Sequence, residues 1–363
     1  MDAASVRQCL LAVVLSVSAT CRQTKEGASV PAPELRRIAS FGDLVGYWQF
    51  AGPSGRHVAA LDRDETRDED QLQIFTLRDD GWRLVRGVPL VEPSARALDG
   101  ARLGDTTFFC VEVNRSHPLH LWAADYTPLV HHDSTSAVSL TARLDLAPAD
   151  VAATEVRTPW HVMDLQPEAW LFRPRLVRGD VRTPWIIASM ADGRVALLDT
   201  AGEGRVLRAL PIRQALEPQA TRLGNELVVA FQRPAATDVS PFWLEPRNGK
   251  IVSGDLVVAH GTQPELNLSA VLGFGPVVRF ALAPGWQGGV WLFALIDAPV
   301  GTDVVALERA QGKWIQRERR SFDREFSDVS AEAGANPGEW HLVYQTASAE
   351  GSTLEYQAWQ RGR

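Results

Sequence analysis

The chain has 363 residues, of which 45% are hydrophobic and 22% are charged, the proportions of an ordinary globular protein. Its 28 glycines and 22 prolines together are only slightly above average usage, which excludes a collagen-like or disordered chain. The net charge of -7 provides no uniform positive field, so we expect neither nucleic acid nor an anionic lipid surface to be a partner.

The first 21 residues have the layout of a secretory signal. Arg7 follows the amino terminus, an apolar run extends from Cys9 to Val17, and small residues lead up to Cys21. Because the apolar run is too short to span a bilayer, we interpret residues 1–21 as a signal peptide.

The residues just before Cys21 resemble a bacterial lipobox, in which the cysteine is lipidated and becomes the new amino terminus. Ser18 and Thr20 depart from its most common residues. Residues 22–35 contain almost no large apolar side chains and are predicted to be a flexible tether. We therefore expect a protein of the bacterial cell envelope, anchored by a lipid at Cys21, or an extracellular protein if Cys21 is unmodified.

Processing would leave few cysteines. Beyond the signal only Cys21 and Cys110 remain, and Cys110 lies in the apolar run 108–111, where we expect a buried and inert thiol. Residues 36–363, expected to be a single domain and a monomer, must then be stabilised by their hydrophobic core alone.

A turn followed by a short apolar strand recurs along residues 36–363, with almost no helical periodicity between the copies. The clearest match pairs Arg102–Asp105 and the strand after it with Arg222–Asn225 and the strand after it. Their separation equals two units of roughly 60 residues. Similar segments occur at 55–62, 183–190, 288–296 and 338–345. We predict that all six segments are the same strand of successive sheets.

A second feature, a strand that leads into a tight polar turn with glycine, follows several of these segments. It occurs at 77–82, 198–202, 244–249 and 307–312. Asn248-Gly249 is a favoured type I′ hairpin sequence, because glycine readily adopts the positive φ that the turn requires. The final unit ends at 354–360 without an outer strand, and residues 36–40 could supply it. Such pairing of the two ends would protect the exposed edges of the first and last sheets.

In this generic sense the chain resembles the β-propeller superfamily over nearly all of residues 36–363. It shows no repeated Gly-His and Trp-Asp signature, and Asp79–Trp82 is only loosely similar to the Asp-box of sialidase-like propellers. The resemblance implies an all-β fold of six four-stranded blades, closed by pairing of the terminal strands. Seven blades are the alternative, because residues 134–182 widen the spacing and Val-Arg-Thr-Pro-Trp occurs at both 156–160 and 181–185. A pair of β-sandwich or jelly-roll domains is the alternative architecture.

Histidines are concentrated in one short region. Four of the eight lie within 117–133, followed by an aspartate; these candidate metal ligands are His117, His120, His131, His132 and Asp133. If residues 124–126 form a hairpin tip, His120 and His131 face each other across two strands. Cross-strand neighbours have Cβ atoms about 5 Å apart, so these two imidazoles could share Zn²⁺ or Cu²⁺. Exposed strand histidines without a ligand role are the alternative.

Residues 62–70 contain six carboxylates, a density of oxygen ligands that could bind Ca²⁺. The EF-hand pattern is absent, and the simpler interpretation is a solvated hairpin tip between two strands. The 12 tryptophans are spread along the whole chain, which is typical of rings that fill the spaces between neighbouring sheets. Trp286, in the apparent loop 284–289, is the best candidate for an exposed ring that stacks on a sugar.

No nucleophile elbow, zinc-protease helix or phosphate-binding glycine loop is visible in the sequence. The first hypothesis is therefore a non-catalytic envelope propeller that binds a protein or glycan partner. The second is an extracellular carbohydrate-active hydrolase or lyase with its site in the central funnel. Such an enzyme, if sialidase-like, needs an arginine cluster, a tyrosine and paired carboxylates there, and no motif shows which residues those would be.

Overall fold

The computed structural model describes residues 34–361 with internal gaps. The residues outside the description are 1–33, 53–54, 65–68, 91–94, 104–105, 114–119, 122–136, 139–162, 165–170, 180, 182–184, 191–192, 200–205, 235–252, 262 and 362–363. The chain divides into two compact units, Met1–Ala32 and Pro33–Arg363, and every described residue belongs to the second. The predicted signal peptide, Cys21 and nearly all of the predicted tether therefore lie outside the described residues.

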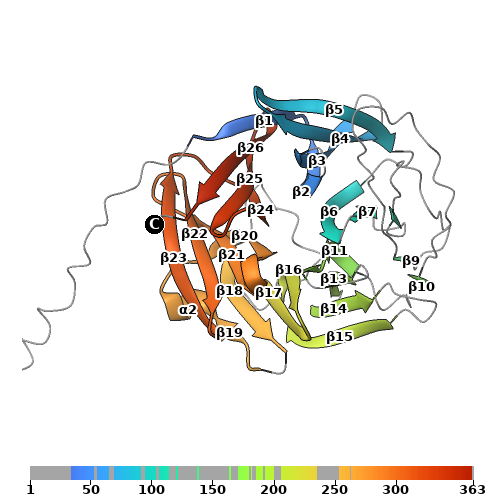
Figure 1. Ribbon diagram of the computed structural model, residues 1–363. Helices are drawn as coiled ribbons and strands as arrows, with labels where there is room; N and C mark the ends of the chain where they lie inside the picture. The colour runs from blue at the N-terminus through green and yellow to red at the C-terminus, as the bar shows by residue number, and fades with distance from the viewer. Residues whose placement is uncertain are drawn as a thin grey trace, which may run out of the picture. The chain divides into compact units, whose positions relative to one another are not determined.

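The described strands pair mostly with their neighbours in the sequence and form successive antiparallel meanders (Figure 1). The first contains β2 (Leu44–Gly52), β3 (Gly55–Asp64), β4 (Glu69–Arg78) and β5 (Gly81–Leu90). The second contains β6 (Ala95–Leu103), β7 (Thr106–Val113) and β8 (His120–Leu121). The third contains β11 (Leu171–Leu176), β13 (Trp185–Met190), β14 (Arg194–Asp199) and β15 (Val206–Arg213).

The fourth meander contains β16 (Leu216–Leu223), β17 (Glu226–Pro234) and β18 (Gly254–His260), with β19 (Leu266–Asn267) also on β18. The fifth contains β20 (Val277–Pro284), β21 (Val290–Asp297), β22 (Thr302–Ala310) and β23 (Lys313–Phe322). The next contains β24 (Asp328–Ala333), β25 (Glu339–Ser348) and β26 (Gly351–Gln360), with β1 (Arg36–Phe41) on β26.

Four short elements complete the description. Strand β12 (Arg178–Gly179) pairs in parallel with β16, whereas β9 (Ala137–Val138) and β10 (Met163–Asp164) pair with each other. The helix α2 (Leu268–Leu272) lies between β19 and β20. A single backbone pair between β18 and β20 connects the fourth and fifth meanders.

The repeat predicted from the sequence is confirmed in these meanders. The six turn-then-strand segments correspond to β3, β7, β13, β17, β21 and β25, which are the second strands of successive meanders. The turns at 77–82 and 307–312 connect third strands to fourth strands, whereas residues 200–202 of the segment 198–202 and all of 244–249 lie outside the described residues. The number of blades remains a prediction, because most of residues 122–170 are not described.

Contacts between the first strands of the meanders form a closed cycle. Strand β2 contacts β6, β6 contacts β11, β11 contacts β16, β16 contacts β20, β20 contacts β24, and β24 contacts β2. Among the second strands, β21 is buried at every residue but its last. Such strands have continuous apolar runs rather than an alternating pattern, which is why they were recognisable in the sequence. By contrast, the outermost strand β23 is rich in charged and partly exposed residues.

The predicted pairing of the two ends is also present. Strand β1 pairs antiparallel with β26, from Arg36 opposite Tyr356 to Phe41 opposite Ser352. Between the first and last meanders, the hydroxyl of Tyr47 in β2 donates to the carbonyl of Val343 in β25 at 3.1 Å. Strand β1 thus supplies the outer strand of the last meander, as the sequence predicted (Figure 1).

Tryptophans fill the spaces between neighbouring sheets, in agreement with their predicted structural role. Trp291, Trp340 and Trp359 share one buried cluster with Phe293, and the Trp291 and Trp340 ring centroids are 5.3 Å apart. In the first sheet, Trp48 packs so closely against Gly100 of β6 that a Cβ atom there would lie 2.2 Å from its indole nitrogen. We call the first strand of each meander its innermost strand, since these strands contact one another around the cycle. The close approach of the innermost strands β2 and β6 requires glycine at position 100.

Candidate functional site

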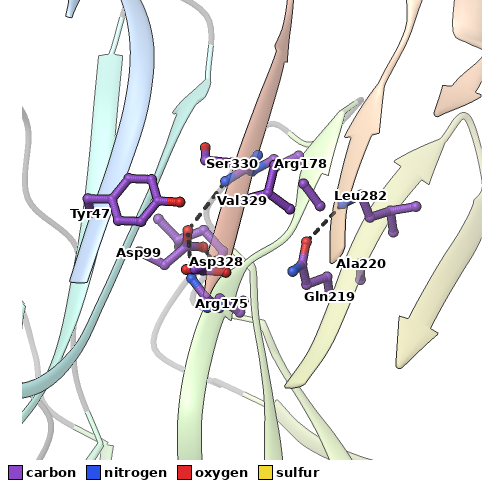
Figure 2. A pocket seen from close by; sticks show the side chains of 12 residues that line it. Tyr47, Asp99, Arg175, Arg178, Gln219, Ala220, Leu282, Asp328, Val329 and Ser330 are labelled. Atoms are coloured by element: carbon purple, nitrogen blue, oxygen red, sulfur yellow. Dashed lines mark hydrogen bonds and ion pairs between the residues drawn. The ribbon is translucent and has the colours of Figure 1, made fainter. Parts of the chain in front are cut away.

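A pocket lies where the innermost strands meet, and each of these strands contributes to its wall (Figure 2). The polar residues that line it are Tyr47, Asp99, Arg175, Arg178, Gln219, Asp328 and Ser330. It encloses about 390 Å³ that no protein atom fills, part of which is open solvent. The enclosed part has room for roughly one or two water molecules.

Backbone bulges direct side chains toward this pocket. Strands β11 and β16 each shift register, between Phe172 and Arg175 and between Leu216 and Gln219. Arg173 and Glu217 lie inside these bulges, and both have a left-handed φ of 49°. Because each precedes a proline, which cannot donate a ladder hydrogen bond, the sequence favours an irregular strand at both positions.

The two bulges bring opposite charges together. Arg173 forms an ion pair with Glu217, although the residues belong to different sheets. Arg175 Nη2 lies 3.6 Å from Glu217 Oε2, and Arg279 Nη2 lies 3.8 Å from Glu217 Oε1. Burial lowers the pKa of the Arg279 guanidinium, since charge is costly in this environment. Glu217 is therefore the shared counter-ion of three arginines.

Asp99 has the same role on the other side of the pocket. Its carboxylate accepts a hydrogen bond of 2.7 Å from the Leu176 backbone amide and one of 3.3 Å from Arg178 Nη2. Arg175 Nη1 lies 3.6 Å from the same carboxylate. Arg178 also donates to the Ala331 carbonyl, so Asp99 and Arg178 connect three innermost strands around the pocket.

The charged groups of this pocket are held by other groups of the protein. The side chains of Arg175 and Arg178 interact with carboxylates of the protein itself. Burial raises the pKa of the Tyr47 phenol well above its ordinary value, so Tyr47 stays protonated. Its hydroxyl donates a hydrogen bond to the Val343 carbonyl. A tyrosine, arginines and carboxylates are thus gathered at the pocket; Arg175 and Arg178 pair with Asp99, whereas Tyr47 donates to a backbone carbonyl.

A second candidate site lies at the carboxyl end of β20. The strand has a register shift between Val277 and Arg279, and the site is roughly 20 Å further along it. The chain there turns through a short 3-10 segment at Trp286–Gly288. Trp286 is 46% exposed, which confirms the exposure predicted for it. Its indole Nε1 donates to the Gly334 carbonyl at 3.2 Å, so the ring is fixed against the loop that connects β24 to β25.

That neighbouring loop presents hydrogen-bonding groups. Asn336 donates from its backbone amide and from Nδ2 to Glu339 Oε2, at 3.2 and 2.9 Å. Burial raises the pKa of Glu339, but the hydrogen bonds from Asn336, together with the electrostatic effects of His341 and Arg56, lower it overall. Glu339 is therefore ionised at neutral pH. We call Trp286, Gln287, Asn336 and Glu339 the Trp286 corner.

Two histidines are buried in neighbouring meanders, His57 in β3 of the first and His341 in β25 of the last, and His341 is adjacent to this corner. His57 Nδ1 lies 2.7 Å from Thr76 Oγ1, and His341 Nδ1 lies 2.6 Å from the Tyr356 hydroxyl. Burial, followed by the charges of Arg78 and Arg56, lowers the pKa of His57 to about 4. Burial and Arg56 likewise lower the pKa of His341 to about 4, against an opposing effect of Glu339. Both imidazoles are neutral at pH 7.

The side chains of the predicted metal ligands are not part of the described structure. The side chains of His117, His120, His131, His132 and Asp133 lie outside the description, and only the backbone of His120 is placed, opposite Val111. Within the described ranges, no group of three or more histidine, cysteine, aspartate or glutamate residues could bind a metal ion. A Zn²⁺ or Cu²⁺ site at 117–133 therefore stays a prediction.

The acidic segment 62–70 joins β3 to β4, with Asp64 opposite Glu69 in the ladder, as predicted for a hairpin tip. Its Asp70 is fully buried, and Arg63 Nε lies 3.4 Å from Asp70 Oδ1. Residues 65–68 are not described, so Ca²⁺ binding by this segment also stays a prediction. Among the helices of the described residues, none is long and apolar enough to cross a bilayer.

The sequence interpretation did not identify the charged residues of the pocket. Arg173-Pro174 and Glu217-Pro218 occupy equivalent places in β11 and β16, and this repeated residue-proline pair was the signal that could have located the bulges. Nothing local indicates that Arg173 and Glu217 meet, because their contact depends on the packing of two sheets.

No protein-family model matches the chain, and no curated protein matches it. Solved structures do. A mutant of NanB sialidase from Streptococcus pneumoniae aligns with a TM-score of 0.55 at 8% identity, covering 93% of this chain and 72% of that one. The phage phi92 endosialidase aligns with a TM-score of 0.53 at 8% identity, covering 91% and 69%. The SapL1 lectin, solved with alpha methyl fucoside, gives 0.51 at 11% identity, covering 90% and 95%.

The chain has the β-propeller fold. At these low identities the likeness shows the fold alone, and a β-propeller is a scaffold that carries many unrelated functions. The alternative of two sandwich or jelly-roll domains is not supported.

Proposed function

We propose that this protein is a non-catalytic propeller of the bacterial cell surface that binds a glycan through the Trp286 corner. The observation that carries the proposal is the Trp286 ring, which is exposed and yet held by a hydrogen bond to the neighbouring sheet. A fixed indole face matches the apolar face of a pyranose and loses little conformational freedom on binding.

One further observation favours a binder over an enzyme in this proposal. The arginines that line the pocket between the first strands are paired with carboxylates of the protein. Solved structures of this fold include a lectin bound to a fucoside as well as sialidases, which supports a carbohydrate ligand for either kind of protein. Export and a lipid anchor at Cys21 belong to the same proposal, since the amino-terminal sequence has the layout of a signal peptide.

The proposal is tested with the mature protein on a printed glycan array and on a panel of chromogenic glycosides. We expect binding to at least one glycan and no release of chromophore. Trp286→Ala should weaken that binding at least about tenfold, because it removes the stacking surface. Turnover of any glycoside would contradict the non-catalytic assignment, and equal binding by the variant would exclude the corner.

A further inference from the structure

The Trp286 corner is pre-organised around the ring. The Gly285 amide donates to the Gly289 carbonyl at 2.8 Å and the Gly289 amide to the Trp286 carbonyl at 3.2 Å, so the loop is closed on itself. Within it Gln287 has a φ of 54°, a conformation that costs free energy for a residue other than glycine. Such strain is concentrated at functional sites, and here it positions an exposed amide side chain directly after the indole.

The indole has one hydrogen-bond donor, and Gly334 uses it. The ring therefore offers a ligand its face alone, and polar contacts must come from the neighbouring amides. Asn336 is exposed, and the Glu339 carboxylate holds its backbone amide and its Nδ2. Its amide oxygen is left to accept a hydrogen bond from a hydroxyl group.

The two loops that form the corner carry charge of one sign, and Arg56 and Arg361 lie beside them. The loops 284–289 and 334–339 contain a single ionisable side chain, that of Glu339. Glu339 lies against Gly334, where a Cβ atom would come within 2.4 Å of its Cγ. His341 Nε2 lies 3.2 Å from Glu339 Oε1 but is neutral at pH 7, and the nearby Arg56 is paired with Glu332 at 2.6 Å. Arg361 borders the second loop, because its backbone amide donates to the Gly338 carbonyl at 2.9 Å, but its guanidinium lies 3.6 Å from the carboxylate of Glu308.

We infer that the Trp286 corner selects uncharged saccharides, with Trp286 as the stacking surface and the amides of Asn336 and Gln287 as hydroxyl ligands, and that Glu339 excludes sugars that carry a carboxylate. This inference rests on the proposed function and adds the chemical class of its ligand. Glu339 acts as a positioning residue for Asn336 and as the source of the repulsion, since like charges in a binding site disfavour the wrong ligand.

The test uses matched pairs of oligosaccharides that differ only in a terminal sialic or uronic acid, titrated calorimetrically into the mature protein. We expect the neutral member to bind at least about tenfold more tightly, and this ratio to fall as sodium chloride is raised, because salt screens exposed charges. Glu339→Gln keeps the shape of the side chain and should reduce the ratio severalfold while retaining binding of the neutral sugar.

Val300→Ala serves as the matched control, because Val300 is 72% exposed and lies in the turn between β21 and β22. It should leave both affinities unchanged. Equal or tighter binding of the acidic member, or an unchanged ratio in Glu339→Gln, would overturn the inference while leaving glycan binding established. Failure of every saccharide to bind would instead overturn the proposed function, and the inference with it.

Discussion

Glu217 is a buried carboxylate whose three neighbouring arginines come from two other strands, β11 and β20. A buried ion pair adds little net stability compared with a well-packed apolar core, but removal of one partner leaves uncompensated charge in a poorly solvated place. Because Glu217 lies in a bulge with a left-handed φ, it also carries backbone strain, which its contacts with the arginines help to offset.

Glu217→Gln should therefore destabilise the protein by about 3 kcal/mol, because three guanidinium groups lose their shared counter-ion. Urea unfolding followed by tryptophan fluorescence measures the change. Glu325→Gln, at an exposed position, is the control and should change the free energy of unfolding by less than about 0.5 kcal/mol. Equal stability of the two variants would show that the cluster is not a counter-ion arrangement.

At the scale of strands, two buried histidines, His57 in β3 and His341 in β25, make the stability depend on pH. His57 and His341 both have a pKa of about 4 in the folded protein, below the ordinary value of 6.5. The unfolded chain therefore binds protons first as the pH falls. Their contribution is complete above pH 6.5, declines between pH 6.5 and about 4, and is constant at lower pH. The charges that face them are those of Arg56, Arg78, Glu332 and Glu339.

We expect the free energy of unfolding to fall by as much as about 1.4 kcal/mol per pH unit for each histidine in this window. Chemical unfolding at pH 7, 6, 5 and 4 measures the slope. The double variant H57Q/H341Q should be less stable at pH 7 but should lose less stability on acidification. A slope that is the same in the variant and the parent would exclude the histidines as its source.

The sequence could predict the strands because their signals are local. The apolar run after a glycine turn identifies β21, and the loop Pro284–Gly289 identifies Trp286 as exposed. The sites could not be predicted in the same way. Trp286 is fixed by Gly334 of the next sheet, and Arg173 meets Glu217 only after two bulged strands pack together. These contacts depend on how the sheets pack against one another. The sequence around a charged strand residue does not indicate which residue of another sheet it will meet.

For the whole molecule, the decisive contact is between β1 and β26. Strand β1 is the first described strand and yet completes the last sheet, so the chain between them is enclosed by one ladder of hydrogen bonds. Ile38 and Phe41 of β1 are buried in the same cluster as Val58 of the first meander and Leu354 of the last. Loss of β1 would remove this part of the core and expose an edge of β26.

Deletion of residues 36–41 should therefore lower the stability of the entire domain in one step. We expect a single calorimetric transition at a clearly lower temperature, coincident with the loss of tryptophan fluorescence, because each sheet is stabilised by both of its neighbours. Deletion of residues 22–33, which belong to the predicted tether, is the control and should leave the transition temperature unchanged. Two separate transitions, with the last meander melting first and the others unaffected, would mean that the terminal strand is attached to the ring without closing it.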